Sequence, residues 1–529
     1  MHDTVPASQV ASVAEYADRL AFLRRPDVYP DQPLQVEAIE THISWVFLTR
    51  RYAYKLKKPV SFGFIDFSTV ERRQAACQNE IRVNRRLAPH VYLGITPITF
   101  DRHGRRCLGG HGEVDDWLVQ MRRLPADRAL DQLLAAGTFT PRDVTLLAER
   151  LVEFYSSLPP LSLKTADFRA AIERHVRDNL TTLLTARPAC SPLLVRRTHA
   201  AQLRLLALHP AWWDERVCDG RVVEGHGDLR PEHIYFVPRP VIIDAIEFND
   251  ELRRVDVLDE LSFLAMECGC RGVPAVGRQI RDHYCAATRD QPPRLLPSFY
   301  EAYRACVRAK VAVLRAGQQA EAAAACSRRA ALRYLEWAEE TLVSSVRPLV
   351  LAVCGPSGSG KSTLAGALAE SLGAELLQTD RLRQRVPAQD TAAGSRYGQG
   401  SYSTEQRGAI YQQMAQQVGE LLRQNVTVVL DGTFLLQAYR HLVEEAAARA
   451  GAALCYVRCG CPTELRRSRV VERLRSETTL SDMRPEWLLD QEREADPWPA
   501  SDRLLTVDTT QSVAALVAQV MRFLGPLLE

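Results

Sequence analysis

Lysine is the scarcest charged residue of this 529-residue chain, with only six copies among 67 basic side chains. The sequence also lacks an apolar run long enough to span a membrane, and residues 1–10 lack the basic and apolar regions of a signal peptide. Its net charge is only +3, which excludes the strongly basic surface of a nucleic-acid or lipid-binding protein. We therefore expect a cytoplasmic protein with no membrane or nucleic-acid partner.

The 13 cysteines show no C-x-x-C pair, and the C-G-C triplets at 268–270 and 459–461 do not have a standard zinc spacing. These cysteines are therefore interpreted as reduced structural thiols. Hydrophobic residues make up 46% and charged residues 25% of the chain, as in an ordinary globular protein, and the length suggests two to four domains.

Four of the six lysines lie in two short segments, residues 54–58 and 355–362. In a chain that uses arginine for nearly every other positive charge, lysine at these places suggests chemistry that needs a compact, mobile ammonium group. Both segments are typical of sites for the phosphates of ATP.

The second segment matches the pattern G-x-x-x-x-G-K-[ST] of a phosphate-binding loop, or P-loop. An apolar run at 349–354 predicts a buried parallel strand before it, and residues 362–369 predict a helix after it. In this context backbone amides enclose the phosphates, Lys361 reaches the β and γ oxygens, and the Ser362 hydroxyl ligates magnesium. The predicted site for ATP and Mg²⁺ consists of Gly355, Ser357, Gly358, Ser359, Gly360, Lys361, Ser362 and Thr363.

Strand and helix patterns divide the chain into two predicted domains, 1–345 and 346–529, separated where residues 344–348 break a helix. The first has a small lobe at about 30–120, with short strands between 34 and 65, a helix from about 70 to 87 and another strand at 114–121. A mostly helical lobe at about 121–345 follows. The second has strands near 349, 375, 426, 453 and 504 with helices between them, which predicts a doubly wound parallel sheet.

The stretch H-G-D-L-R-P-E-H-I begins at His226, and an apolar strand that ends in Asp244 follows it. With these residues the chain resembles, over roughly 35–340, the aminoglycoside phosphotransferase-like branch of the protein-kinase fold. The resemblance implies a bilobal fold in which Asp228 accepts or orients the proton of the acceptor hydroxyl and Asp244 holds magnesium. The fold class expected for the whole chain is thus α/β and α+β, a protein-kinase-like fold followed by a P-loop NTPase fold.

By the same resemblance, Lys55 in the stretch A-Y-K matches the strand lysine that grips the α and β phosphates of ATP. Glu80, on the following helix, is its implied ion-pair partner. Lys57 lies two residues further along the same strand face and competes for the role of the ATP lysine. The sequence leaves the choice between these lysines open.

Two features depart from the family pattern. His233 stands where the catalytic loop has an Asn that holds a second metal ion, and imidazole binds magnesium less well than an amide oxygen does. The expected nucleotide-covering loop at residues 40–44 has no G-x-G-x-x-G motif. These departures predict a first domain that binds ATP and turns it over slowly or not at all.

In the second domain, Asp380 follows the second predicted strand and Arg383 comes three residues later. This pattern resembles the small P-loop kinases grouped with zeta toxins, chloramphenicol phosphotransferase and the kinase half of polynucleotide kinases. The resemblance implies that Asp380 is the general base and that Arg383 contacts the acceptor. Asp431, after the third strand, either orients magnesium through water or belongs to an ordinary Asp-Gly turn.

Arg466, Arg469 and Arg473 share one face of a predicted helix near the C-terminus. Kinases of this kind use such arginines to stabilise the transferring phosphoryl group, and Arg473 is predicted to act in this way. The alternative interpretation is a solvated basic face, because arginine is the usual cation of this chain.

Together these features predict an ATP- and Mg²⁺-dependent phosphotransferase with two ATP sites that acts on a small hydroxylated molecule. The fused arrangement looks like proteins described as bifunctional aminoglycoside phosphotransferase and ATP-binding proteins. One alternative is a kinase-like sensor domain that regulates a P-loop ATPase switch. Another, a nucleic-acid end kinase, is disfavoured by the missing basic charge. The sequence indicates neither the acceptor nor the oligomeric state.

Overall fold

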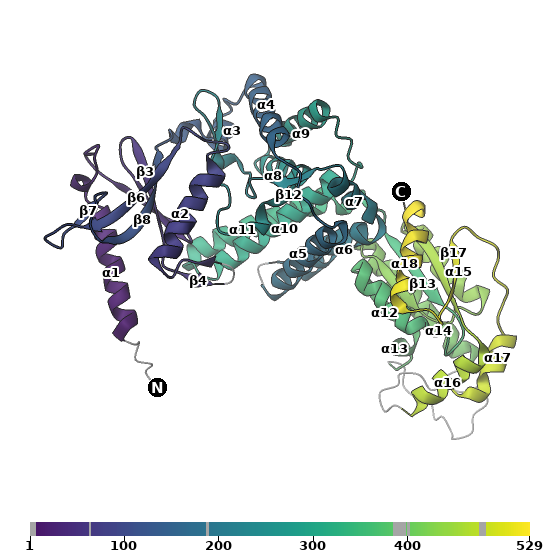
Figure 1. Cartoon of the computed structure of the whole chain (residues 1–529). Coiled ribbons are helices and arrows are strands. Elements are labelled where there is room, and N and C mark those ends of the chain that lie inside the picture. The colour runs from purple at the N-terminus through teal and green to yellow at the C-terminus, as the bar shows by residue number, and fades with distance from the viewer. Residues whose placement is uncertain are drawn as a thin grey trace. The chain divides into compact units, whose positions relative to one another are not determined.

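The computed structural model describes residues 7–62, 65–186, 190–384, 398, 403–475 and 483–528. The chain forms two compact units (Figure 1). The first consists of residues 1–163 and 216–292, and the second of residues 164–215 and 293–529.

The first unit begins with a six-stranded antiparallel sheet in the order β1-β2-β3-β8-β6-β7. Its strands are β1 (Glu37–Glu40), β2 (Ser44–Leu48), β3 (Tyr52–Lys57), β6 (Tyr92–Phe100), β7 (Arg106–Leu108) and β8 (Val114–Arg122). A two-stranded ribbon, β4 (Ser61–Phe62) and β5 (Ile65–Asp66), follows β3. The predicted short strands between 34 and 65 are thus present, whereas the sequence analysis did not predict β6 and β7.

Two helices cover opposite faces of this sheet, α1 (Ala7–Leu23) and α2 (Val70–Asn84). Side chains alternate along a strand, so Tyr54 and Leu56 pack with residues of α1, whereas Ala53 packs with residues of α2. The same alternation puts both lysines of β3 on the α2 face, where Glu80 lies.

The rest of the first unit is built on helices packed around a common apolar core. The helices are α3 (Leu130–Ala135), α4 (Pro141–Ser157), α8 (Val257–Cys270) and α9 (Pro274–Thr288). Two small antiparallel pairs complete this part: β9 (Val222–Glu224) with β12 (Arg254–Asp256), and β10 (Ile234–Phe236) with β11 (Pro240–Ile242).

Four long helices of the second unit come from the predicted helical lobe of the first domain: α5 (Thr165–Thr185), α6 (Pro192–Leu208), α10 (Leu296–Ala316) and α11 (Glu321–Thr341). The short helix α7 (Pro210–Cys218) spans the division of the chain at residue 216. These four helices thus belong to the same compact unit as the P-loop part. Within that unit, α6 packs on α12 and α18 and contributes Leu208 to their core. The sequence-based boundary at 345/346 stays a prediction. None of the helices within the described residues has both the length and the apolar character needed to cross a membrane.

A five-stranded parallel sheet forms the rest of the second unit, in the order β14-β15-β13-β16-β17. The strands are β13 (Leu349–Cys354), β14 (Glu375–Gln378), β15 (Val428–Asp431), β16 (Ala453–Gly460) and β17 (Leu504–Asp508). The helices are α12 (Lys361–Leu372), α13 (Thr379–Gln384), α14 (Thr404–Arg423), α15 (Gln437–Arg449), α16 (Thr463–Leu474), α17 (Leu488–Arg493) and α18 (Val513–Leu524). The prediction of a parallel sheet in this part of the chain is confirmed.

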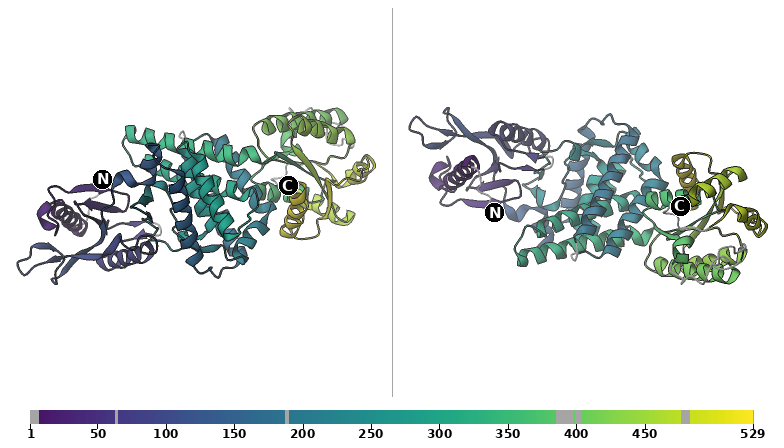
Figure 2. Two further views of the ribbon diagram at one scale, coloured as in Figure 1. Left: turned by 90° about the horizontal axis from the view of Figure 1, so that it is seen from above. Right: turned by 90° about the horizontal axis from the view of Figure 1, so that it is seen from below.

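Helices lie on both faces of this sheet, as the two views of Figure 2 show, with green helices on one side and the yellow C-terminal helix on the other. Every residue of β13 is buried. Leu349, Leu351 and Val353 pack with α12 and α18, and the alternate residues pack with α14 and α15. A strand apolar on both faces must lie inside a sheet covered on both sides, which explains its central place.

Candidate functional site

The P-loop joins the end of β13 to the start of α12 and depends on three glycines in left-handed conformations. Gly355, Gly358 and Gly360 have φ values of 139°, 77° and 83°. A Cβ atom on Gly358 would lie 2.5 Å from the carbonyl oxygen of Arg466, and one on Gly355 would lie 2.5 Å from that of Cys459. These positions therefore require glycine both for backbone conformation and for close packing on β16 and α16.

Two buried oxygens near the P-loop have no hydrogen-bond partner within the described residues, Ser359 Oγ and Asp431 Oδ1. The second oxygen of Asp431 accepts a hydrogen bond of 3.0 Å from Gln378 Nε2. Lys361, the first residue of α12, is only 8% exposed. Because buried polar groups normally have partners, these unpaired oxygens and the ammonium group fit a site for a polar ligand such as a magnesium-bound phosphate.

The acceptor-side residues of the prediction lie at the same edge of the sheet as Asp431. Gln378, the last residue of β14, is opposite Asp431 in the register of the parallel strands, and Asp380 follows in the first turn of α13. Arg383 Nη1 donates a hydrogen bond of 2.5 Å to Asp380 Oδ1. The structure thus brings Asp380, Arg383 and Asp431 to the carboxyl ends of neighbouring strands, where ligands bind in open α/β sheets.

Three residues distant in sequence hold the P-loop in place. The amide of Ser357 donates to Gln491 Oε1 at 2.7 Å, and Thr509 Oγ1 donates to the carbonyl oxygen of Ser359, also at 2.7 Å. Arg469 of α16 donates to the carbonyl oxygens of Gly358, at 3.4 Å, and of Thr509, at 3.0 Å. Among the arginines of α16, Arg469 thus contacts the P-loop directly, and the role assigned to Arg473 stays a prediction.

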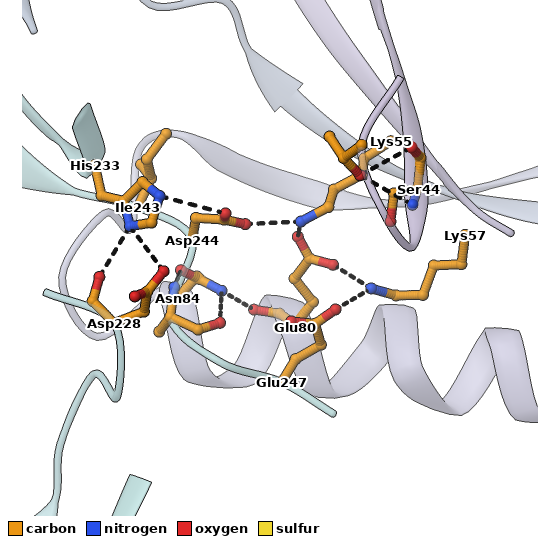
Figure 3. A network of polar contacts seen from close by, with 12 residues as sticks. Ser44, Lys55, Lys57, Glu80, Asn84, Asp228, His233, Ile243, Asp244 and Glu247 are labelled. Atoms are coloured by element: carbon orange, nitrogen blue, oxygen red, sulfur yellow. Dashed lines mark hydrogen bonds and ion pairs between the residues drawn. The ribbon is translucent and has the colours of Figure 1, made fainter. Parts of the chain in front are cut away.

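A second cluster of charged residues lies in the first unit, between β3, α2 and the segment after β11 (Figure 3). Lys55 Nζ lies 2.9 Å from Glu80 Oε1 and 2.7 Å from Asp244 Oδ1. Burial alone would lower the pKa of Lys55, but the carboxylates of Asp244 and Glu80 raise it well above its ordinary value. Burial would likewise raise the pKa of Asp244, but Lys55 lowers it far below its usual range. Both side chains are therefore held in their charged forms.

Lys57 belongs to the same cluster but has different surroundings. Its Nζ lies 2.6 Å from Glu80 Oε2 and forms a second ion pair with Glu247. The side chain of Lys57 is fully buried, whereas that of Asp244, the partner of Lys55, is 46% exposed. Lys55 therefore lies at the solvent-exposed side of the cluster, and Lys57 lies at its buried side.

Backbone contacts fix the loop that carries the predicted catalytic aspartate. The amides of His226 and Gly227 both donate to the carboxylate of Glu260, and Tyr155 donates to that carboxylate at 2.7 Å. His226 Nδ1 accepts from the amide of Asp228, so its Nε2 carries the proton and donates to the carbonyl oxygen of Ile243. Through this neutral imidazole, the segment that carries Asp228 is joined to the strand that leads to Asp244.

His233 lies between the two predicted functional aspartates (Figure 3). Its Nδ1 is 2.9 Å from the carbonyl oxygen of Asp228, and its Nε2 is 3.7 Å from Asp244 Oδ2. Arg230 donates through Nε to Asp228 Oδ2 at 3.0 Å and through Nη2 to His233 Nε2 at 3.1 Å. Within the described residues, no group of three or more His, Cys, Asp or Glu side chains is arranged to hold a metal ion.

Comparison with known proteins matches residues 350–497 to the family model of an AAA domain. The protein named Uncharacterized protein Rv2004c, from Mycobacterium tuberculosis strain H37Rv, is 33% identical over 454 residues, which cover 84% of this chain and 88% of that protein. A Mycobacterium bovis protein, Uncharacterized protein Mb2027c, gives the same values. The chain belongs to the family of these mycobacterial proteins.

Two solved structures also resemble part of the chain. A gluconokinase from Sinorhizobium meliloti 1021 is 21% identical, with a TM-score of 0.26, over 35% of this chain and 95% of its own. The Mycobacterium tuberculosis APS kinase in complex with AMPPNP and APS is 21% identical, with a TM-score of 0.26, over 34% of this chain and 98% of its own.

Several residues at these sites were not predicted from the sequence. Gln491 and Thr509 lie more than a hundred residues after the P-loop and carry no motif of their own, so nothing in the sequence connects them with it. Arg230 lies inside the stretch that begins at His226, two residues after Asp228. This short spacing was the signal in the sequence that could have suggested their contact. Glu247 follows Asp244 by three residues, but a single acidic residue there is too common to single out.

Proposed function

We propose that this protein is an ATP- and Mg²⁺-dependent phosphotransferase that acts on a hydroxyl group of a small molecule. The observation that carries the proposal is the arrangement at the edge of the parallel sheet. There the P-loop, the half-unpaired carboxylate of Asp431 and the Asp380–Arg383 pair meet at the ends of neighbouring strands. Phosphoryl transfer depends mainly on positioning and on charge neutralisation, which such a set of groups supplies.

In this proposal each residue of the P-loop part has a separate task. The loop amides and Lys361 bind the triphosphate, and the oxygens of Ser362 and Asp431 hold magnesium, directly or through water. Magnesium supplies positive charge beside the phosphate oxygens. Asp380 accepts the proton of the acceptor hydroxyl, and Arg383 orients the acceptor. Arg469, which already contacts the P-loop, joins Arg473 as a candidate for stabilising the transferring group.

The first unit is proposed as a second ATP site of protein-kinase-like design. Lys55 supports this role better than Lys57 does, because Lys55 joins the helix carboxylate of Glu80 to the half-exposed Asp244. Lys57 instead closes the buried side of the cluster with Glu247. Asp228 would orient the acceptor hydroxyl, and Asp244 would bind magnesium.

One observation favours the alternative in which the first unit is a sensor. Arg230 Nε donates at 3.0 Å to Asp228 Oδ2, so one oxygen of the proposed catalytic carboxylate already has a cationic partner. In the sensor alternative the first unit binds ATP without transferring phosphate and regulates the P-loop part, which acts as an ATPase switch.

Radiolabel transfer from γ-labelled ATP to a panel of polyols, sugars and aminoglycosides tests the proposal. We expect Asp380→Asn to reduce transfer by at least about 100-fold, as loss of a general base does. Asp502→Asn, at an exposed aspartate of the same unit, is the matched control and should leave transfer unchanged. Under the sensor alternative Asp228→Asn changes nothing, whereas a comparable loss in that variant shows catalysis in the first unit. Absence of transfer to every hydroxyl tested, together with absence of ATP hydrolysis, would contradict the proposal.

A further inference from the structure

The cluster around Asp228 contains a cation that the sequence motif does not predict, the guanidinium group of Arg230. It donates from Nε to Asp228 Oδ2 at 3.0 Å and from Nη2 to His233 Nε2 at 3.1 Å. Its third nitrogen, Nη1, bonds to Glu232. All three nitrogens of one guanidinium group are therefore used within the six residues 228–233.

The position of Arg230 is itself fixed. Its side chain is 15% exposed, and Glu232, which holds Nη1, also accepts a bond of 3.0 Å from Arg271 at the end of α8. Arg271 in turn pairs with the buried Glu267. A side chain anchored through such a series of ion pairs provides a charge at a defined place.

The chemistry of His233 agrees with a cation at this place. Arginine only donates, so His233 Nε2 accepts the bond from Arg230, and the ring proton lies on Nδ1, which donates to the carbonyl oxygen of Asp228. His233 Nε2 also lies 3.7 Å from Asp244 Oδ2. Arg230 therefore contacts Asp228 directly and is linked to Asp244 through the ring of His233.

We propose that the guanidinium of Arg230 is the second cation of the Asp228–Asp244 site, in the place where protein kinases hold a second magnesium ion. Kinases hold two magnesium ions, one on the metal-binding Asp and one on the Asn of the catalytic loop. Here the Asn is replaced by His233, whose Nε2 is already occupied by Arg230. The site therefore takes one divalent cation, at Asp244, and Arg230 neutralises the charge on the other side.

This inference rests on the proposed function of the first unit, but its test does not depend on turnover. The full chain with Lys361→Ala, which removes the P-loop site, is titrated with Mn²⁺ in the presence of a non-hydrolysable ATP analogue, and electron paramagnetic resonance reports the free ion. With Arg230 present we expect one bound Mn²⁺ per chain. Arg230→Gln should bind two, because it removes the guanidinium group from Asp228 Oδ2 and from His233 Nε2.

Pulsed electron paramagnetic resonance adds a direct signature. The second Mn²⁺ of Arg230→Gln should show coupling to an imidazole nitrogen, and the double variant Arg230→Gln with His233→Ala should lose both the coupling and the second ion. Arg230→Lys keeps a positive charge and should stay at one ion. Arg239→Gln, at an exposed arginine between β10 and β11, is the matched control and should also stay at one.

Two ions bound with Arg230 in place, or no added ion in Arg230→Gln, would overturn the inference. So would the absence of any bound ion in the presence of Arg230. If Arg230→Gln fails to fold, the number of Mn²⁺ ions bound per chain with Arg230 and in Arg230→Lys still tests the inference. A change from one ion to two without phosphate transfer by any variant would leave this inference standing and refute the proposed function of the first unit.

Discussion

The three lysines at the end of β3 and just after it offer a sharp test of how the first unit is held together. Lys57→Met removes a fully buried ammonium group that pairs with Glu80 at 2.6 Å and with Glu247. Breaking a buried pair by removing one partner typically costs about 3–5 kcal/mol, because the remaining carboxylates are buried without full compensation. Methionine keeps the unbranched stem, so the loss reports mainly the charge.

The control is Lys58→Met, one residue further along the chain. Lys58 pairs with Glu40 at 2.5 Å, but the Glu40 side chain is 55% exposed, and an exposed pair contributes about 0–1 kcal/mol. Hydrogen exchange of the amides in β3 and α2 measures the free energy of opening of this region. We expect a loss of several kcal/mol for Lys57→Met and of less than about 1 kcal/mol for Lys58→Met.

Lys55→Met separates stability from binding in the same series. Lys55 also contacts Glu80, but its other partner, Asp244, is half exposed and can be solvated when the lysine is lost. We expect a smaller loss of stability than for Lys57→Met, together with loss of ATP binding to the first unit. Equal losses of stability for Lys57→Met and Lys58→Met would refute this account of the cluster.

Three further predictions concern the second unit. Gly358→Ala should weaken the binding of Mg-ATP in calorimetry, because the left-handed backbone costs about 1–2 kcal/mol for a residue with a Cβ atom and that atom would meet α16. The control Gly366→Ala should bind Mg-ATP normally, because a Cβ atom there meets nothing within 4 Å. Burial lowers the pKa of His199 in α6 to about 4, so protonation of this side chain favours the unfolded state. The free energy of unfolding should therefore fall by about 3 kcal/mol as the pH drops from 6.5 to 4. In urea unfolding, His199→Leu should lose this part of the pH dependence, and an unchanged pH profile would contradict the prediction. Gln491→Ala should speed hydrogen exchange of the Ser357 amide and weaken ATP binding, and unchanged exchange would show that this contact does not hold the loop.

The parallel sheet could be predicted from the sequence because its signals are local. The run 349–354 is apolar on both strand faces, the glycines and Lys361 follow without a gap, and the helix pattern comes next. Each of these features forms within a few residues of chain. The order of the strands and the contacts of Gln491 and Thr509 depend instead on pairings between distant segments, which no local pattern records.

In the first unit the sequence identified Lys55, Lys57 and Asp244 and indicated Glu80 as the partner of Lys55, but it could not assign the other partners. The alternation of β3 puts Lys55 and Lys57 on one face, so both reach Glu80, and only the positions of Asp244 and Glu247 distinguish them. Both of those carboxylates come from a segment about 190 residues away. Grouping of α5, α6, α10 and α11 with the P-loop part is likewise a matter of tertiary packing, which a helix pattern in the sequence does not reveal.

The most direct test of the central claim is the number of ATP sites. Isothermal titration of the full chain with a non-hydrolysable ATP analogue and Mg²⁺ should give two nucleotides per chain. Lys361→Ala should remove one of them and Lys55→Ala the other. A protein that binds no nucleotide, or whose binding survives both substitutions together, would contradict the claim that these lysines mark two triphosphate sites.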